Sequence, residues 1–452
     1  MSTIAAIGTP QGKGGVALIR ISGEDAFSIA EKLFIPASAS RFAQKLHGVT
    51  YYGSFRDESG VFDDGMCVLF HSPRSFTGEC VAELYCHGGL LVTQKLLAAA
   101  LKNGASMALP GEFTRRAFIN GKITLTQAEA IGGIIDSKTE KHLSIASKQA
   151  NGSLSRALGE IYDDLKLLAA SVYAYIDYPD EDMTDVSVPE MRSRLVAVKD
   201  KLNRLAGTHT YGKAISEGIP TAIVGKPNTG KSSLLNRLCG EERAIVTDIA
   251  GTTRDIVTET VRLGDLLLRL SDTAGIRESE DTVEKIGIEK SKQAINTAEL
   301  ILAVFDASRG VDDDDNALIN AILQSNKADS TLCIINKTDI SAEIPVLPFK
   351  NTVFISAKSG DGIEDLVTAV AQMFGAGNIN ESDEIVVNAR QCAAIVNAAG
   401  AVESAVNALN GFTQDVAGMD IELALSALAE ADGRTVSEDI VNEIFSHFCV
   451  GK

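Results

Sequence analysis

Short apolar runs alternate with helix-sized segments between about residue 215 and about residue 374. The runs read TAIVG, LLLRLSD, LILAVFD, TLCIIN and TVFIS. Near-continuous apolar strands joined by helices are typical of a mostly parallel sheet that is covered on both faces. The sequence therefore predicts a self-contained α/β unit over residues 215–376.

The first of these runs leads into a phosphate-binding loop. Residues 225–232 read GKPNTGKS and match GxxxxGK[ST], directly after TAIVG and before SSLLNRL. Glycines let backbone amides wrap phosphates at a helix N-terminus, Lys231 reaches the β- and γ-phosphates, and Ser232 binds magnesium. So loose a pattern also arises by chance, but the strand, loop and helix context favours a genuine nucleotide site.

Further segments follow in the order that GTPases use, at residues 251–255 (GTTRD), 272–275 (DTAG), 336–339 (NKTD) and 356–358 (SAK). The first offers a switch threonine, and the second an Asp for magnesium and a Gly amide for the γ-phosphate. Asp339 can accept hydrogen bonds from N1 and the 2-amino group of guanine, a donor that adenine lacks. Any one segment could be a turn, but all of them in register predict specificity for GTP over ATP.

The residue that follows DTAG complicates hydrolysis. Ras-type GTPases place a water-orienting glutamine there, whereas this chain has Ile276. Acidic residues lie just downstream, at Glu278, Glu280, Asp281 and Glu284. Candidate arginine fingers are Arg243, Arg254 and Arg277. A slow GTPase that awaits an activator is the alternative.

The rest of the chain shows two kinds of sequence pattern. Residues 1–118 mix β-rich runs (15–22 and 80–86) with turn-rich pieces (72–79 and 109–116), which predicts an α+β domain. Residues 119–214 and 377–452 place apolar residues at helical spacing, so the α/β unit is expected to interrupt one discontinuous helical domain. The stretch 178–191, with two prolines and several acidic residues, reads as a solvated loop.

Composition restricts the class of protein further. The net charge of −18 argues against broad nucleic-acid binding, although it allows a local basic patch. The 7 cysteines are odd in number and never form CxxC, which indicates reduced thiols in a reducing compartment. Cys80, Cys86 and His87 are close in sequence, but strand residues alternate faces, which disfavours zinc. With no uncharged apolar run of about 18 residues, we expect a cytoplasmic protein without a membrane span.

Several longer motifs carry a more specific resemblance. They are GKPNTGKSSLLN, AIVTDIAGTTRD, DTAGIRE with VEKIGIEK, the terminal FCVGK and, in the first third, SFTGEC, HGG, PGEFTRRAF and KITLTQAEAI. Over its whole length the sequence resembles the MnmE (TrmE) family of tRNA modification GTPases, within the TrmE-Era-EngA-like group. It departs from the family pattern at Lys226 and Thr229, and at Val450 where isoleucine is common.

The resemblance implies which groups take the place of the missing water-orienting glutamine and of an arginine finger. In that family the GTPase domains of two subunits pair, and a potassium ion beside the phosphates replaces an arginine finger. The implied magnesium ligands are Ser232 and Thr253, and the implied potassium ligands are Asn228, Thr247, Ile249 and Thr252. Glu284 would orient the attacking water; from the residues alone, a solvated acid at a helix start is the alternative.

The motifs and the resemblance together define the predicted GTP contacts. They are Asn228, Thr229, Gly230, Lys231, Ser232, Ser233, Thr247, Asp248, Ile249, Ala250, Gly251, Thr252, Thr253, Asp272, Thr273, Ala274, Gly275, Asn336, Lys337, Asp339, Ser356, Ala357 and Lys358.

The first domain resembles the family's tetrahydrofolate-binding and dimerising module. The implied contacts to a 5-formyl- or methylene-tetrahydrofolate are Arg20, Glu83, Lys122 and Lys452. Polar residues in strand-like runs, such as Arg20 and Glu83, otherwise most often face solvent. Cys449 is either a nucleophile towards a uridine ring or a packed structural thiol. The GKGG at 12–15 precedes a strand and lacks GK[ST], so it is not a second phosphate loop.

Taken together, the resemblance implies a GTP-hydrolysing homodimer that helps install a carboxymethylaminomethyl-type group at C5 of the wobble uridine of tRNA. The implied partner is the flavoprotein MnmG (GidA), in a heterotetramer. Two alternatives stay open. A ribosome-assembly GTPase would need an RNA-binding module or a second GTPase domain, and a nucleotide-controlled binding switch would show negligible turnover.

Overall fold

The computed structural model describes residues 2–177, 187–241, 259–270, 294–340, 346–380, 383–411 and 414–451. The chain forms two compact units. The first comprises Met1–Gly132, Ala150–Ser155 and Asp432–Lys452, and the second comprises Gly133–Gln149 and Arg156–Ala431.

The first unit is built on a 7-stranded sheet with the order β3-β4-β5-β6-β2-β1-β7. All neighbouring strands are antiparallel except the parallel pair β1 and β7. The strands are β1 (Ile4–Ile7), β2 (Gly14–Ser22), β3 (Phe34–Pro36), β4 (Thr50–Asp57), β5 (Gly60–Phe70), β6 (Val81–Gly88) and β7 (Ser106–Met107). Alternate strand residues such as Ile19, Leu69 and Leu84 are buried in one core with helices α1 (Ala26–Leu33) and α3 (Leu90–Lys102). The predicted α+β character is confirmed.

Helices from both ends of the chain complete this unit. They are α2 (Ala39–Phe42), α4 (Glu112–Ile119), α5 (Leu125–Asp136) and α17 (Glu438–Ser446). Leu125 of α5 shares a small buried cluster with Phe445 of α17. Nearby, Thr126 Oγ1 donates to Asp432 Oδ1 at 3.0 Å. The C-terminal stretch is therefore packed into the same unit as the N-terminal sheet.

The turn-rich reading of residues 109–116 was wrong in its second half, because α4 begins at Glu112. Gly111 takes the left-handed conformation at the helix start, and Glu112 places a carboxylate in the first turn. Phe113 and Ala117 then face the interior, four residues apart. The Pro-Gly pair marks the beginning of a helix rather than a longer turn.

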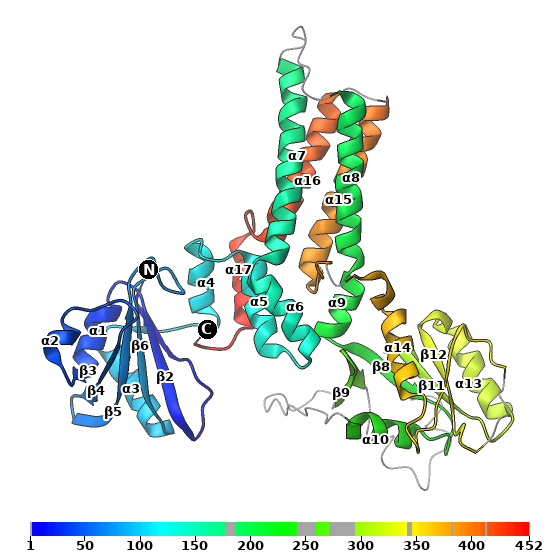
Figure 1. Ribbon diagram of the computed structural model, residues 1–452, viewed down its shortest axis with the longest axis horizontal. Coiled ribbons are helices and arrows are strands. Elements are labelled where there is room, and N and C mark those ends of the chain that lie inside the picture. Colours follow the sequence, from blue (N-terminus) through cyan, green and yellow to red (C-terminus); the bar gives the residue numbers. More distant parts are fainter. Residues whose placement is uncertain are drawn as a thin grey trace. The chain divides into compact units, whose positions relative to one another are not determined.

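The second unit contains long helices that lie side by side (Figure 1). They are α7 (Ser153–Asp177), α8 (Val188–Gly207), α15 (Ala389–Gly411) and α16 (Gln414–Asp432), with the shorter α6 (Glu140–Ala150) and α9 (His209–Ser216). The predicted loop over 178–191 is too long at its end, because α8 already begins at Val188. Pro189 fits in the first helical turn, where no intrahelical N–H is required. Residues 178–186 lie outside the described part.

One stretch of α15, Ala389–Leu409, is long and apolar enough to cross a membrane by length and composition. We expected no such stretch, but this one is not uncharged, since it includes Arg390 and Glu403. Ile395 and Val402 are buried within the unit. A core helix of a helical bundle has the same composition.

The α/β part of the second unit is a 6-stranded sheet with the order β13-β12-β11-β8-β10-β9. Its strands are β8 (Ile219–Val224), β9 (Glu259–Leu263), β10 (Leu266–Leu270), β11 (Leu300–Asp306), β12 (Thr331–Asn336) and β13 (Asn351–Phe354). All neighbouring pairs are parallel except β9 with β10. The sequence analysis predicted the parallel strands and missed β9.

Helices cover this sheet on both faces, as predicted. On one face, α9, α10 (Lys231–Glu241) and α14 (Ile363–Met373) share a core with alternate strand residues such as Leu302 and Ile334. On the other face, α13 (Asp313–Gln324) packs Ile319 and Ile322 against residues such as Ala303. Two short 3-10 turns, η1 (Ala328–Ser330) and η2 (Ala376–Asn378), complete the described elements. The carboxyl ends of the parallel strands thus lie along one edge, where such folds bind ligands.

Candidate nucleotide-binding site

The predicted phosphate-binding loop connects the end of β8 to the start of α10. Three of its residues have positive φ angles, Gly225 at 154°, Asn228 at 64° and Gly230 at 97°. Asn is among the few side chains that tolerate the left-handed region. At Gly230 a Cβ atom would lie 2.1 Å from Asn336 Nδ2, so only glycine fits. The loop therefore wraps tightly against the end of β12.

Lys231, the first residue of α10, points its ammonium group back over this loop. Its Nζ donates to the main-chain oxygens of Gly225 at 2.7 Å and Lys226 at 2.8 Å. Burial lowers the pKa of Lys231 below its ordinary value. Ser232 and Ser233 follow in the exposed first turn of α10. A cation and the free amides of a helix N-terminus together favour an anion such as a phosphate.

Asn336, at the end of β12, joins two of the predicted motifs. Its Nδ2 donates to Thr229 O at 2.9 Å, and its Oδ1 accepts from Ala357 N at 2.9 Å. Asn336 is buried, so both hydrogen bonds form away from water. One side chain thereby fixes the phosphate-binding loop relative to the Ser356-Ala357-Lys358 segment.

Lys337 connects the same loop to the end of β11. Its Nζ donates to Asn228 O at 2.7 Å and pairs with Asp306 Oδ2 at 2.6 Å. Burial alone raises the pKa of Asp306. Hydrogen bonds from Lys337 and Ser308 and the charge of the lysine outweigh this effect, so the net pKa is below its ordinary value and the carboxylate stays ionised. The sequence analysis did not single out Asp306; its signal was a lone acid at the end of a fully apolar strand.

The remaining motif residues lie beside this junction. Ser356 is buried and its Oγ accepts from Ser359 N at 3.2 Å, while Lys358 and Asp339 are exposed. Arg237 of α10 donates to Lys358 O at 3.1 Å, which ties the segment to the helix after the phosphate-binding loop. The structure thus brings the loop at 225–232 together with the segments at 336–339 and 356–358.

Several predicted site residues lie outside the described part of the chain. They are Thr247, Asp248, Ile249, Ala250, Gly251, Thr252, Thr253, Asp272, Thr273, Ala274, Gly275, Glu284 and Lys452.

In the first unit, two predicted folate contacts form an ion pair across neighbouring strands. Arg20 of β2 lies opposite Glu83 of β6, and Arg20 Nε donates to Glu83 Oε1 at 2.9 Å. Arg20 also donates to Gly451 O at 3.4 Å. Burial and the hydrogen bond to Glu83 raise the pKa of Tyr85 to about 12. These side chains are half-buried and paired, not simply solvent-facing.

Two other residues predicted in this unit, Lys122 and Cys449, hydrogen-bond to groups other than Arg20 and Glu83. Lys122 is exposed and donates to Pro73 O at 3.0 Å. Cys449 is exposed, and its main-chain oxygen accepts from Gly111 N at 3.4 Å. An exposed thiol does not fit the packed structural cysteine that was one of the two readings.

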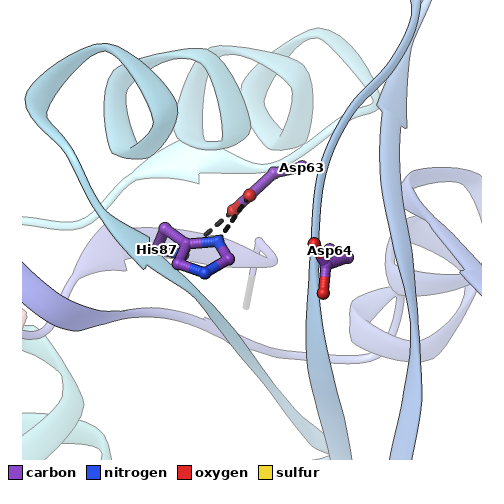
Figure 2. A group of neighbouring side chains, drawn as sticks. All are labelled: Asp63, Asp64 and His87. Atoms are coloured by element: carbon purple, nitrogen blue, oxygen red, sulfur yellow. Dashed lines mark hydrogen bonds and ion pairs between the residues drawn. The ribbon is translucent and has the colours of Figure 1, made fainter.

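Asp63 and Asp64 of β5 lie next to His87 of β6 (Figure 2), with potential ligand atoms within 4.8 Å of one another. His87 Nδ1 pairs with Asp63 Oδ1 at 2.7 Å, and His87 N donates to Asp63 Oδ2 at 2.9 Å. The hydrogen bond to Asp63 raises the pKa of His87. Both oxygens of Asp63 are thus already engaged, so an ion pair accounts for the group without a metal. Cys86 is buried on the opposite face of β6, as strand alternation predicted.

A phosphate-binding loop fixed by an Asn-Lys pair and a Ser-Ala-Lys segment, at the carboxyl edge of a parallel sheet, defines the class of P-loop GTPases. The family model "MnmE helical domain" matches residues 125–449, and "GTP-binding protein TrmE N-terminus" matches residues 3–122. The chain belongs to the MnmE family of tRNA modification GTPases.

Two relatives illustrate the match. The tRNA modification GTPase MnmE of Acetivibrio thermocellus is 41% identical over 460 residues, which cover 100% of this chain and 99% of that protein. The MnmE of Lysinibacillus sphaericus is 41% identical over 461 residues, with the same coverage. Among solved structures, Era of Aquifex aeolicus bound to GDP and aluminium fluoride is 29% identical in the aligned part. The alignment covers 40% of this chain and 65% of the Era chain, with a TM-score of 0.26.

Proposed function

We propose that this chain hydrolyses GTP at the loop of residues 225–232 as part of tRNA modification. The observation that carries the proposal is the double fixation of that loop, by Asn336 on Thr229 O and by Lys337 on Asn228 O. Asp339, the proposed guanine acceptor, is exposed and follows Lys337 by two positions in the chain. In this proposal, phosphate binding and base selection both depend on the segment 336–339.

Lys231→Ala tests the site. The variant should lose binding of fluorescent GDP, because it removes the ammonium group that faces the phosphates. Asp339→Asn should weaken GDP binding and relax discrimination against ADP. Wild-type GDP affinity in both variants would contradict the assignment.

The finer mechanism that we propose uses cations and a second copy of the chain. The exposed Ser232 hydroxyl at the start of α10 suits magnesium, together with Thr253. The exposed Asn228, held in the left-handed region, offers its side-chain oxygen for potassium, together with Thr247, Ile249 and Thr252. Cations bound there would neutralise charge that develops on the phosphates. Glu284 would orient the attacking water, and pairing of two GTPase domains would complete the site.

GTP turnover in potassium and in sodium tests this mechanism. We expect faster turnover in potassium, and a loss of turnover with retained GDP binding for Glu284→Ala. Glu278→Ala, which removes a neighbouring acid, serves as the matched control and should keep wild-type turnover. Equal, slow rates in both salts would instead favour a nucleotide-controlled binding switch.

The first unit is proposed to bind a tetrahydrofolate derivative. The half-buried Arg20–Glu83 pair beside the main-chain oxygen of Gly451 offers both a cation and an anion at one place. A folate carries carboxylates and a hydrogen-bonding pterin, so both charges have a complement. Lys122 and Lys452 are the other proposed contacts, and Cys449 is a proposed nucleophile. Calorimetric titration with 5-formyltetrahydrofolate should show binding that Arg20→Met weakens; unchanged affinity would refute the assignment.

The proposed product is a C5-modified wobble uridine, made with a flavoprotein partner of the MnmG (GidA) type in a cytoplasmic complex. The net charge of −18 suits a division of labour in which the partner holds much of the tRNA. Nucleoside analysis of tRNA from cells that lack this chain tests the assignment. Unmodified wobble uridines are expected, and an unchanged nucleoside profile would exclude it.

A further inference from the structure

Lys226, one of the two positions where the phosphate-binding loop departs from the family pattern, has a side chain that leaves the loop. Its Nζ donates to Asp312 Oδ2 at 2.5 Å and to Asp315 Oδ2 at 2.7 Å. The Lys226 side chain is only 12% exposed and that of Asp315 only 6%. The side chain of Asp312 is 55% exposed, so the Lys226–Asp315 half of this clamp is the buried one, unlike the exposed ion pairs that contribute little.

The two carboxylates of the clamp belong to a rigid element. Asp312 is the N-cap of α13, and its side chain accepts from Asp315 N at 3.1 Å in a capping box. Farther along the helix, Ile319 and Ile322 anchor α13 in the core on that face of the sheet. The clamp therefore ties the phosphate-binding loop to a helix that cannot shift without opening that core.

The main-chain oxygen of Lys226 faces the nucleotide site. It accepts from Lys231 Nζ at 2.8 Å and from Thr229 Oγ1 at 3.0 Å. Thr229, the other departure from the family pattern, is completely buried. The side chain of Lys226 thus fixes the position of an oxygen on which two loop residues depend.

The charges of Lys226 and Asp312 stabilise the clamp at neutral pH. Burial alone lowers the pKa of Lys226, but hydrogen bonds and charges from Asp312 and Asp315 raise it above its ordinary value. The hydrogen bond from Lys226 is the largest of the effects that lower the pKa of Asp312, to about 2. Lys226 and Asp312 are therefore both charged at neutral pH.

We propose that Lys226 is a positioning residue of the GTPase: its clamped side chain holds its main-chain oxygen in place, which orients Lys231 and so sets the affinity for the nucleotide phosphates. The proposal rests on the proposed GTP site. It concerns ground-state binding, because the clamp lies behind the loop and touches no reacting atom.

The test compares full-length variants for GDP affinity, for kcat and KM with GTP, and for melting temperature. Lys226→Met keeps the aliphatic stem and removes the charge; GDP affinity should fall and KM should rise about tenfold, with kcat within about twofold of wild type. Lys226→Arg can still reach both carboxylates and should recover affinity to within about threefold. Lys213→Met removes another lysine ion pair of this unit, with Glu299 at 2.9 Å, and should leave GDP affinity, kcat and KM unchanged.

Asp315→Asn provides a second route if Lys226→Met folds poorly. It removes one charge of the clamp and should weaken GDP binding, with no additional loss when combined with Lys226→Met. Normal GDP affinity in both single variants, even with a lower melting temperature, would overturn the positioning role. Lys231→Ala separates the two proposals: if it also binds GDP normally, the site assignment itself fails, whereas if it alone loses binding, only the role of Lys226 fails.

Discussion

Replacement of Gly230 by alanine should reshape the phosphate-binding loop. Gly230 has a φ of 97°, and a Cβ there would lie 2.1 Å from Asn336 Nδ2. Positive φ costs a non-glycine residue about 1–2 kcal/mol. Displacing Asn336 costs about 1–2 kcal/mol more, because its buried hydrogen bonds to Thr229 O and from Ala357 N are weakened.

If the loop relieves this strain by rearranging, restoring the binding conformation costs about 2–4 kcal/mol, which lowers GDP affinity by roughly 30-fold to 1000-fold. Titration of fluorescent GDP measures the effect, and thermal unfolding shows whether the variant is folded. Gly375→Ala is the matched control, since Gly375 has a φ of 90° but nothing lies within 4 Å of its Cβ position. It should lose about 1–2 kcal/mol of stability and keep wild-type affinity. A Gly230→Ala protein that binds GDP within threefold of wild type would refute the reasoning.

Three further outcomes are expected. Asn336→Ala should destabilise the second unit by about 2–4 kcal/mol in urea unfolding, since two buried main-chain groups lose their partner; a loss below about 1 kcal/mol would contradict the bridging role. In the native protein, iodoacetamide should label the exposed Cys449 and spare the buried Cys333, whose pKa burial raises to about 12, as read by mass spectrometry before and after denaturation. Asp312 has a folded pKa lowered to about 2, so its ion pair contributes stability above the ordinary pKa of 3.8 and loses it as the pH falls towards 2. The melting-temperature difference between wild type and Lys226→Met should therefore be constant above about pH 5 and shrink below pH 4; a difference that persists at pH 2 would argue against the clamp.

Local pattern was sufficient to predict the parallel strands and the phosphate-binding loop. The runs that form β11 and β12 are buried along their whole length, and even the run at the edge strand β13 is mostly apolar, so the runs stand out from their neighbours. The loop depends on residues that adjoin one another. Strand β9 was not predicted because Glu259–Leu263 has polar residues on one face and pairs at the edge of the sheet. Helix α4 escaped because a Pro-Gly pair marks turns and helix starts alike.

Pairings between distant residues could not be predicted. Arg20 and Glu83 meet because β2 and β6 pair in one particular register, and a shift of one residue would place them on opposite faces. Lys226 and Asp315 are 89 positions apart and meet only once α13 docks below the sheet. The acidic run that contains Asp315 looks, in sequence, like any solvated loop. These contacts are set by packing, which sequence periodicity does not report.

The membership of Asp432–Lys452 in the first unit bears on how the protein is made. Roughly 300 residues separate Gly132 from Asp432 along the chain, and a ribosome that adds about 5–20 residues per second needs roughly 15–60 s to translate them. Until then Thr126 lacks its acceptor Asp432, and Leu125 lacks Phe445. The part of the molecule that leaves the ribosome first is thus among the last to be finished. Throughout that interval its unpaired apolar surface is open to chaperones and to neighbouring nascent chains.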